Sequence, residues 1–196
     1  MSWEIQTNIE KLGYIYIVNY ENKVGDKMFK KAMLNDIPFI MGTINFAKDN
    51  LKRMEIDQWQ SGYPNESTIK ADIEAGHSYL YYENNEVVAV LALLFGEDPL
   101  YHVIEEGQWL TNQRYVSIHR VAVVEGHLGK GVMGRVFNLT EQIAQDHDCH
   151  STRVDTHPDN KSMQRALEKA DFKYCGHVFM ANGDLRYAYE KVFPTK

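Results

Sequence analysis

A β-rich run that leads straight into a cluster of glycines constrains the fold of this chain more than any other feature. The run is Tyr115–Val124, and the glycines that follow it within nine residues are Gly126, Gly129, Gly131 and Gly134. Apolar side chains then recur at helical spacing, at Val132, Val136, Leu139 and Ile143. A buried strand, a tight turn and a helix in this order predict an α/β protein, with backbone N–H groups of the turn at the positive end of the helix dipole.

The first half of the chain predicts two helices and a hairpin. After a short strand at Met28–Leu34, a helix capped by Asn35-Asp36 is expected, with one apolar face formed by Ile37, Ile40, Met41, Ile44 and Leu51. A second helix is expected from about Asn65 to Gly76. Tyr79–Tyr82 and Val87–Phe95, joined by a polar turn, predict the hairpin. Its second strand is apolar throughout, which indicates a central strand covered on both faces.

The second half of the chain predicts a strand, a helix and a closing hairpin. Thr152–Thr156 is the strand, Asp159-Asn160 caps the helix, and Asn182-Gly183 forms the hairpin turn. Residues 1–26 are an extension whose run Tyr14–Val18 predicts an added N-terminal strand or hairpin. We therefore expect a single α/β domain over residues 1–196, with its core at 27–192 and a mixed sheet that starts and ends antiparallel.

Size, charge and cysteine content exclude several classes of protein. With 196 residues, 44% of them hydrophobic and 24% charged, the chain is typical of one globular domain. The longest apolar run is nine residues, against roughly 20 for a membrane helix, and no secretory signal is evident, so we expect a cytoplasmic protein without a membrane partner. The net charge is −6 without a long Lys/Arg cluster, so nucleic acid is not expected as a partner. Two cysteines predict no disulfide framework.

The glycine cluster allows three interpretations from its residues alone. Gly129–Gly134 matches the dinucleotide fingerprint G-x-G-x-x-G literally, which is the only support for a nucleotide-binding oxidoreductase, and no suitable βαβ unit follows it. A nucleotide P-loop is excluded because Lys130 precedes Gly131 rather than Ser or Thr. A tight turn without a ligand is the simplest alternative, but so dense a cluster favours a phosphate site.

Two stretches of the sequence resemble a known enzyme family. His119–Gly134 is similar to motif A of the GCN5-related N-acetyltransferases (GNAT), and Asp155–Phe172 is similar to their motif B, including its asparagine at Asn160. Asp57–Asn65 resembles a subgroup of small bacterial members whose acceptor is unknown. The resemblance covers about Met28–Val192. It implies a mixed sheet with helices on both faces, and an N-acetyltransferase that transfers the acetyl group of acetyl-CoA to the amine of a small molecule or peptide by direct attack on the thioester.

The resemblance also implies which residues hold acetyl-CoA. In the family, the strand before the glycine loop pairs its free backbone groups with the pantetheine arm, and the loop binds the pyrophosphate. The matching positions, with those of motif B, are Val121, Ala122, Val123, Leu128, Gly129, Lys130, Gly131, Val132, Met133, Gly134, Asn160 and Leu167. Asn160 also fits a helix cap, and Lys130 also fits a solvated side chain.

Three of these positions depart from the family pattern. Leu128 and Met133 stand where members usually carry Gln or Arg and Gly or Ala, although the backbone N–H groups of the loop remain available as donors. Leu167 stands where many members place a tyrosine that protonates the departing thiolate. Because this general acid is missing, the alternative is a non-catalytic acyl-CoA-binding sensor or regulatory module.

His119 is the candidate general base. On a strand it shares one face with Ser117, Val121 and Val123, and an imidazole can take a proton from an alkylammonium near neutral pH. A hydrogen-bonded core histidine without a catalytic role is the alternative. No metal site is expected, because the residues His147–His150 are crowded at a helix end without a second pair at metal-site spacing.

An acidic loop and three aromatic side chains predict the acceptor side. Between Phe95 and Tyr115 the only basic residue is Arg114, and the acidic residues are Glu97, Asp98, Glu105 and Glu106. In the family this loop and the first two helices wall the acceptor side, so an ammonium group would meet the aromatic faces of Trp59, Tyr63 and Trp109. A solvated acidic loop with packed aromatic residues is the alternative. The sequence does not identify the acceptor, and it leaves a homodimer open.

Overall fold

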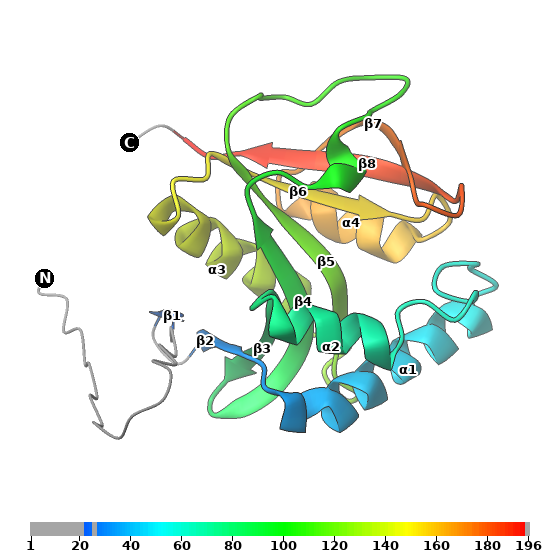
Figure 1. Cartoon of the computed structure of the whole chain (residues 1–196), viewed down its shortest axis with the longest axis vertical. Coiled ribbons are helices and arrows are strands. Elements are labelled where there is room, and N and C mark those ends of the chain that lie inside the picture. Colours follow the sequence, from blue (N-terminus) through cyan, green and yellow to red (C-terminus); the bar gives the residue numbers. More distant parts are fainter. Residues whose placement is uncertain (1–21, 25–26, 195–196) are drawn as a thin grey trace, which may run out of the picture.

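The computed structural model describes residues 22–24 and 27–194, which form one mixed sheet with helices on both faces (Figure 1). The described strands lie in the order β1-β2-β3-β4-β5-β6-β8-β7, and only the β5–β6 pair is parallel. The strands are β1 (Asn22–Val24), β2 (Lys27–Lys31), β3 (Ser78–Glu83), β4 (Glu86–Phe95), β5 (Tyr115–Val123), β6 (Ser151–Thr156), β7 (Lys173–Phe179) and β8 (Leu185–Val192). The helices are α1 (Ile37–Arg53), α2 (Glu66–Glu74), α3 (Val132–Asp146) and α4 (Lys161–Lys169), with short 3₁₀ turns η1 (Leu34–Asp36) and η2 (Pro99–Tyr101).

The expected mixed sheet is confirmed, but the start of the chain differs from the prediction. An added N-terminal strand is present as β1, in a polar part of the extension 1–26. An edge strand needs few apolar side chains, which explains why no hydrophobic pattern in the sequence predicts β1. The predicted run Tyr14–Val18 lies outside the described residues. Strand β2 ends at Lys31, earlier than expected, because Leu34 already begins η1.

Two apolar cores hold the helices against the sheet. Helices α3 and α4 cover one face, where the core includes Leu91, Ile118, Val136, Ile143 and Leu167. Helices α1 and α2 cover the other face, where the core includes Ile40, Ile44, Ile69, Leu80 and Val90. The neighbouring residues Val90 and Leu91 of β4 therefore point to opposite cores, as expected for an apolar central strand. No helix in this part of the chain has the length and apolar content that crossing a bilayer requires.

Strand β5 departs from regular pairing at the middle of the sheet. Against β4, His119 faces Ala92 and Ala122 faces Val90, so Leu91 alone opposes both Arg120 and Val121. This is a β-bulge, which bends a strand and turns a side chain to a new direction. Arg120 adopts a φ of 52°, in the left-handed region that few residues other than glycine occupy. The bulge therefore has a conformational cost that other contacts of Arg120 must offset.

Strands β5 and β6 part just beyond this point. Their parallel pairing ends at Ile118 and Val154. Strand β5 continues to Val123, whereas the last residues of β6, Asp155 and Thr156, pair only with β8. Backbone groups of β5 on this side therefore have no neighbouring strand to bond with.

The connection between β4 and β5, residues 96–114, folds across β7. Glu105 exchanges two backbone hydrogen bonds with His177 of β7, at 2.9 and 2.8 Å. Two glycines permit this close approach. A Cβ added at Gly107 would lie 1.9 Å from the carbonyl oxygen of Cys175, and one added at Gly176 would lie 2.6 Å from the carbonyl oxygen of Glu105. The connection is therefore held to β7 by direct backbone contact.

We expect Gly107→Ala to lower the free energy of unfolding by about 2 kcal/mol, because its methyl group must displace backbone rather than a flexible side chain. The matched control is Gly42→Ala within α1, where a Cβ meets no atom within 4 Å. Helix propensity should make this control more stable by up to about 1 kcal/mol. Urea denaturation measures both variants, and a Gly107→Ala protein as stable as the control would contradict the contact.

Candidate functional site

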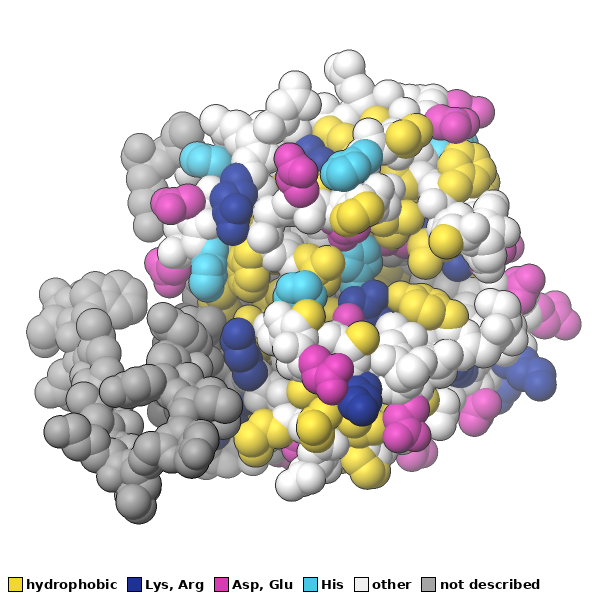
Figure 2. Space-filling view, in the orientation of Figure 1, with side chains coloured by type: hydrophobic (Ala, Val, Ile, Leu, Met, Phe, Trp, Pro, Cys, Tyr) yellow, Lys and Arg dark blue, Asp and Glu magenta, His cyan; other side chains and the backbone are white. Residues whose placement is uncertain are grey.

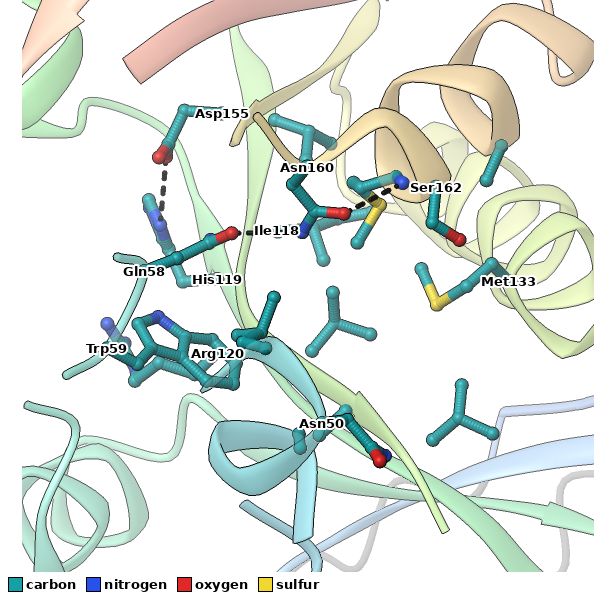
Figure 3. Close-up of a pocket in the computed structure, with 18 of the residues that line it drawn as sticks. Asn50, Gln58, Trp59, Ile118, His119, Arg120, Met133, Asp155, Asn160 and Ser162 are labelled. Atoms are coloured by element: carbon teal, nitrogen blue, oxygen red, sulfur yellow. Dashed lines mark hydrogen bonds and ion pairs between the residues drawn. The ribbon is translucent and has the colours of Figure 1, made fainter. Parts of the chain in front are cut away.

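A cavity of about 210 Å³ opens where β5 and β6 part. Its walls come from β5, the ends of β6 and α1, the start of α4, the glycine loop and the segment 54–63. In Figure 2 this face of the molecule is hollowed near its centre, where histidine, basic and acidic side chains lie among apolar ones. Figure 3 shows His119 and Asp155 at one end of the cavity, which we call the His119 end, and Met133 and Ser162 at the other, which we call the α3 end.

The α3 end presents the backbone of the glycine loop. Gly131 is the N-cap of α3, with a φ of 71°, and the amides of the first helical turn have no carbonyl partner within the helix. A Cβ added at Gly129 or Gly134 would meet no atom within 4 Å. The backbone donors at the positive end of the helix dipole are therefore accessible to an anion.

An arginine in the first turns of α3 ties the loop to the sheet. The guanidinium of Arg135 donates two hydrogen bonds to the carboxylate of Glu83 on β3, at 2.6 and 2.9 Å, and a third, at 2.7 Å, to the backbone oxygen of Lys130. The hydroxyl of Tyr81 donates to the same carboxylate at 2.7 Å. Hydrogen bonds from Arg135 lower the pKa of Glu83, so the carboxylate is charged at neutral pH. The loop conformation is thus fixed by the protein itself.

Asn160 joins the start of α4 to the segment after α1. Its side-chain oxygen accepts the N–H of Met163 at 3.1 Å, which confirms the predicted helix cap. Its side-chain nitrogen donates to Gln58 at 2.9 Å, and Gln58 is buried (Figure 3). Both side chains line the cavity. The proposed contact of Asn160 with the coenzyme stays a prediction.

His119 lies between two carboxylates at the other end. Its Nε2 is 2.5 Å from Oδ2 of Asp98, and its Nδ1 is 3.7 Å from Oδ1 of Asp155 (Figure 3). All three side chains are about nine-tenths buried or more, with exposed fractions of 11%, 6% and 10%. The short contact assigns the Nε2 proton to the Asp98 bond, so that Nδ1 is left as the nitrogen with a free lone pair.

The partners of His119 are themselves held by hydrogen bonds. Asp98 accepts the N–H of Leu100 at 3.0 Å, and its own N–H donates to the hydroxyl of Tyr115 at 2.9 Å. Burial alone would raise the pKa of Asp98, but its hydrogen bond with His119, together with that from Leu100, lowers it overall. Tyr101 donates its hydroxyl to Asp155 at 2.8 Å, and burial raises the pKa of Tyr101 well above its usual value. Tyr101 is therefore a fixed donor rather than an acid.

The bulged Arg120 anchors the segment that closes the His119 end. Its guanidinium donates to one carboxylate oxygen of Asp72 on α2 at 2.8 Å and lies 2.6 Å from the other as an ion pair, and it donates to the hydroxyl of Tyr63 at 2.8 Å. The side chains of Arg120 and Asp72 are each 12% exposed. The ion pair thus links the sheet, α2 and the wall residue Tyr63, and offsets the conformational cost of the bulge.

The cavity brings together many of the predicted site residues. Those that line it are Trp59, Tyr63, His119, Val121, Ala122, Val123, Leu128, Met133 and Asn160. The other predicted loop residues, which form the glycine loop and first turn beside it, are Gly129, Lys130, Gly131, Val132 and Gly134. Their contacts with a ligand stay predictions.

Five further predicted residues belong neither to the cavity lining nor to the glycine loop. Glu97 is exposed, and Glu105 and Glu106 lie over β7, where Glu106 is 3.3 Å from His177. Trp109 packs against Tyr101 and against the guanidinium of Arg153. The reason is the backbone contact at Gly107, which directs the connection toward β7 instead of along the cavity. Leu167 lies on the face of α4 that packs into the core, and its side chain has no exposed surface with which to contact a coenzyme.

Several residues of the site escaped the sequence analysis. Asp155 could have been found, because the parallel register that pairs Ile118 with Val154 also brings His119 beside Asp155. Asp98 is among the acidic residues expected on the acceptor side, but no sequence signal predicts its contact with His119, which it makes from an irregular loop. Nothing in the sequence marks Arg120 as bulged. The described residues hold no trio of His, Cys, Asp or Glu arranged for a metal ion.

Comparison with known proteins identifies the family of this chain. The family model described as the acetyltransferase (GNAT) family matches residues 44–172. This chain belongs to the GNAT family of acetyltransferases. A GNAT acetyltransferase from Streptococcus agalactiae 2603 is 30% identical, covers 90% of this chain and 99% of its own, and superposes with a TM-score of 0.76. A search of curated proteins found no match.

Two more distant structures share the fold of this GNAT protein. One, from Salmonella typhimurium, modifies the N-terminal serine of ribosomal protein L7/L12; it is 16% identical, with a TM-score of 0.59 and coverage of 87% of this chain and 97% of its own. The other is yncA from the same organism, a putative acetyltransferase solved with acetyl-CoA. It is 15% identical, with a TM-score of 0.58 and coverage of 88% and 96%.

We expect Asp72→Ala to lower the free energy of unfolding by about 3 kcal/mol or more, because the buried cation of Arg120 loses its partner. Adding Arg120→Met should recover part of this loss. The matched control is Glu74→Ala on the same helix, whose exposed pair with Lys70 spans 3.8 Å and should contribute no more than about 0.5 kcal/mol. Urea denaturation of the four proteins tests the pair, and equal losses for both single variants would exclude it as an anchor.

Proposed function

We propose that this GNAT protein is an acetyl-CoA-dependent N-acetyltransferase that acts on a primary amine of a small molecule or peptide. The observation that carries the proposal is the pairing, within one cavity, of an open helix N-terminus at the α3 end with a buried His119 between two carboxylates at the other. The first feature suits an anionic coenzyme, and the second suits removal of a proton from an ammonium group.

The chain's own residues fit acetyl-CoA in three respects. The amides of the first turn of α3 are available to phosphate oxygens, and open space lies beside Gly129 and Gly134. The unpaired edge of β5 beyond Ile118 can bond an extended pantetheine arm as a further strand would. Apolar walls formed by Val121, Leu128 and Met133 suit its methylene groups. The acetyl thioester, when bound, supplies the electrophile.

His119 provides the proton acceptor. An alkylammonium has a pKa near 10 and cannot attack a carbonyl carbon until it loses a proton. Nδ1 of His119 can accept this proton, while Asp98 orients the ring through Nε2 and stabilises the imidazolium that forms. The ring then returns the proton to solvent. This arrangement favours catalysis over the alternative of a sensor that only binds acyl-CoA.

The missing tyrosine at Leu167 does not prevent the reaction. Two protons leave the ammonium nitrogen overall: one passes to His119, and the second, released after attack, ends on the thiol sulfur. Positioning of the two reactants accounts for much of the rate that such a transfer needs. The N-terminal serine of ribosomal protein L7/L12, which an acetyltransferase of the same fold modifies, is an example of the peptide class of acceptor.

We expect Gly131→Val to abolish binding of acetyl-CoA, measured by titration calorimetry below the melting transition. A β-branched residue opposes the φ of 71°, and its Cβ would lie 3.3 Å from Arg135, so the loop loses its shape. Gly183→Val is the matched control, because this hairpin glycine has a φ of 88° and no atom within 4 Å of an added Cβ. It should lose stability but keep its affinity. Retained binding by Gly131→Val would refute the loop as the coenzyme site.

A charge change at the same loop separates binding from folding. Gly134→Glu adds a carboxylate at the third helical position, where a glutamate normally stabilises a helix start, and its Cβ has open space. We expect an unchanged or higher melting temperature together with at least about tenfold weaker binding of acetyl-CoA, because two anions then compete for one helix N-terminus. Unchanged affinity would show that phosphate lies elsewhere.

We expect His119→Ala to lower kcat with an amine acceptor by about 10² or more and to remove the limb of the pH–rate profile that reports the base. Affinity for acetyl-CoA should change little, since His119 lies at the opposite end of the cavity from the glycine loop. The control is His102→Ala, an exposed histidine of the neighbouring turn. If the limb persists with the same midpoint in His119→Ala, the proton leaves by another route.

A further inference from the structure

We propose that the carboxylate of Asp155 binds the acceptor's ammonium group, and that the acceptor is a primary amine on an apolar body. This inference rests on the proposed function, because it assigns the acceptor position of that same cavity. It adds a binding residue on β6 and narrows the acceptor class.

The geometry leaves a place for one nitrogen between Asp155 and His119. The Nδ1 of His119 and Oδ1 of Asp155 are 3.7 Å apart, which is too far for a hydrogen bond between them. A nitrogen beside both can donate to the carboxylate and face the imidazole lone pair. The other ring nitrogen is already engaged by Asp98 at 2.5 Å, so Nδ1 is the one that faces the cavity residue Asp155 (Figure 3).

Asp155 is buried but incompletely paired. Its side chain is 10% exposed and lines the cavity, Tyr101 donates to its Oδ1, and no donor among the described residues bonds its Oδ2. A buried carboxylate needs compensating charge or hydrogen bonds. A bound ammonium group supplies a compensating charge and hydrogen bonds. The hydrogen bond from Tyr101 holds the Asp155 carboxylate in the same orientation while the acceptor enters and leaves.

The remaining charges of the cavity favour a cation with an apolar body. Both arginines in its lining are already matched by carboxylates: Arg120 by Asp72 at 2.6 Å, and Arg186 by Asp184 at 3.4 Å. Neither is left to bind a carboxylate of the acceptor. The lining of the cavity also includes the apolar or aromatic side chains of Met54, Trp59, Tyr63 and Met180, and Trp59 lies near His119 (Figure 3). A substrate with one ammonium group and an alkyl or aryl body matches this lining, and an aromatic face adds attraction for the cation.

Binding and deprotonation then occur at one position. The ammonium nitrogen donates one N–H to Asp155 and gives one proton to Nδ1 of His119, which becomes an imidazolium between two carboxylates. The freed electron pair of the amine forms the new C–N bond as the C–S bond of the thioester breaks. The sulfur keeps the electron pair of that bond and takes the second amine proton.

The experiment measures binding of benzylamine, 2-phenylethylamine and hexylamine, each beside the alcohol of the same skeleton, to protein saturated with CoA. The alcohols keep the body and hydrogen-bonding capacity but lack the charge. Titration calorimetry compares the wild type, Asp155→Asn, and Asp159→Asn as the matched control. Asp159 lies four residues away, is 70% exposed in its side chain and is outside the cavity lining. Asn at 155 can still accept the Tyr101 hydroxyl, so the fold should persist.

We expect at least one amine to bind the wild type about tenfold or more tightly than its alcohol, with this preference lost in Asp155→Asn and kept in Asp159→Asn. KM for that amine should rise in Asp155→Asn while KM for acetyl-CoA stays constant. If acetyl-CoA binds but no amine is preferred, or the preference survives Asp155→Asn, the ammonium site is overturned while the proposed function stands. If acetyl-CoA itself does not bind the wild type, the proposed function fails.

Discussion

The ion pair between Arg120 and Asp72 is the interaction on which the rest of the site depends. It holds Arg120 in a left-handed conformation that a strand residue otherwise avoids, and the bulge so formed bends β5 at the point where it leaves β6. The bulge at Arg120 lies just beyond Ile118, the last residue of β5 that pairs with β6, and the cavity opens beyond this point. A buried ion pair contributes little net stability compared with a well-packed apolar pair, so its value here lies in selecting one backbone path. The same guanidinium donates a hydrogen bond to Tyr63. One side chain therefore contacts α2, which stabilises the bulge in the sheet, and also holds a residue of the cavity wall.

The cavity is assembled from segments that are distant in sequence and that meet through polar contacts. The segment after α1 is tied to α4 by Gln58 and Asn160, the connection after β4 is tied to β5 by Asp98 and His119, and the glycine loop is tied to β3 by Arg135 and Glu83. Each of these bonds joins segments that are far apart in the sequence. Apolar packing positions the helices against the sheet, but it is non-directional. The directional bonds are therefore what fix the distances between reacting groups, which must be held to within a fraction of an ångström.

The sequence predicts the regular part of this architecture and much of the α3 end. The spacing of apolar residues identifies the helices, the central strand β4 and the closing hairpin. These elements bury one or both faces, and burial leaves a pattern in the local sequence. The glycine loop is also predictable from local sequence, since its backbone conformation requires glycine at defined positions.

The arrangement of residues at the His119 end is not predictable in this way. Asp98 lies on an irregular connection and Arg120 is displaced by a bulge; each position depends on tertiary contacts that no local pattern encodes. The acidic loop shows the same limit, because two glycines far from its charges decide where Glu105 and Glu106 lie.

The contact of the 96–114 connection with β7 also bears on how the molecule behaves among its own copies. β7 is a terminal strand of the sheet, and a terminal strand offers unpaired N–H and C=O groups on which another chain can add itself. Here the middle of that edge is occupied: the N–H and C=O of His177 are both bonded to Glu105, and a bulge between Tyr174 and Gly176 breaks the regular spacing on either side. An incoming strand would find no continuous row of free groups to match. The connection that brings Asp98 to His119 thereby also protects the β7 edge of the sheet from edge-to-edge aggregation.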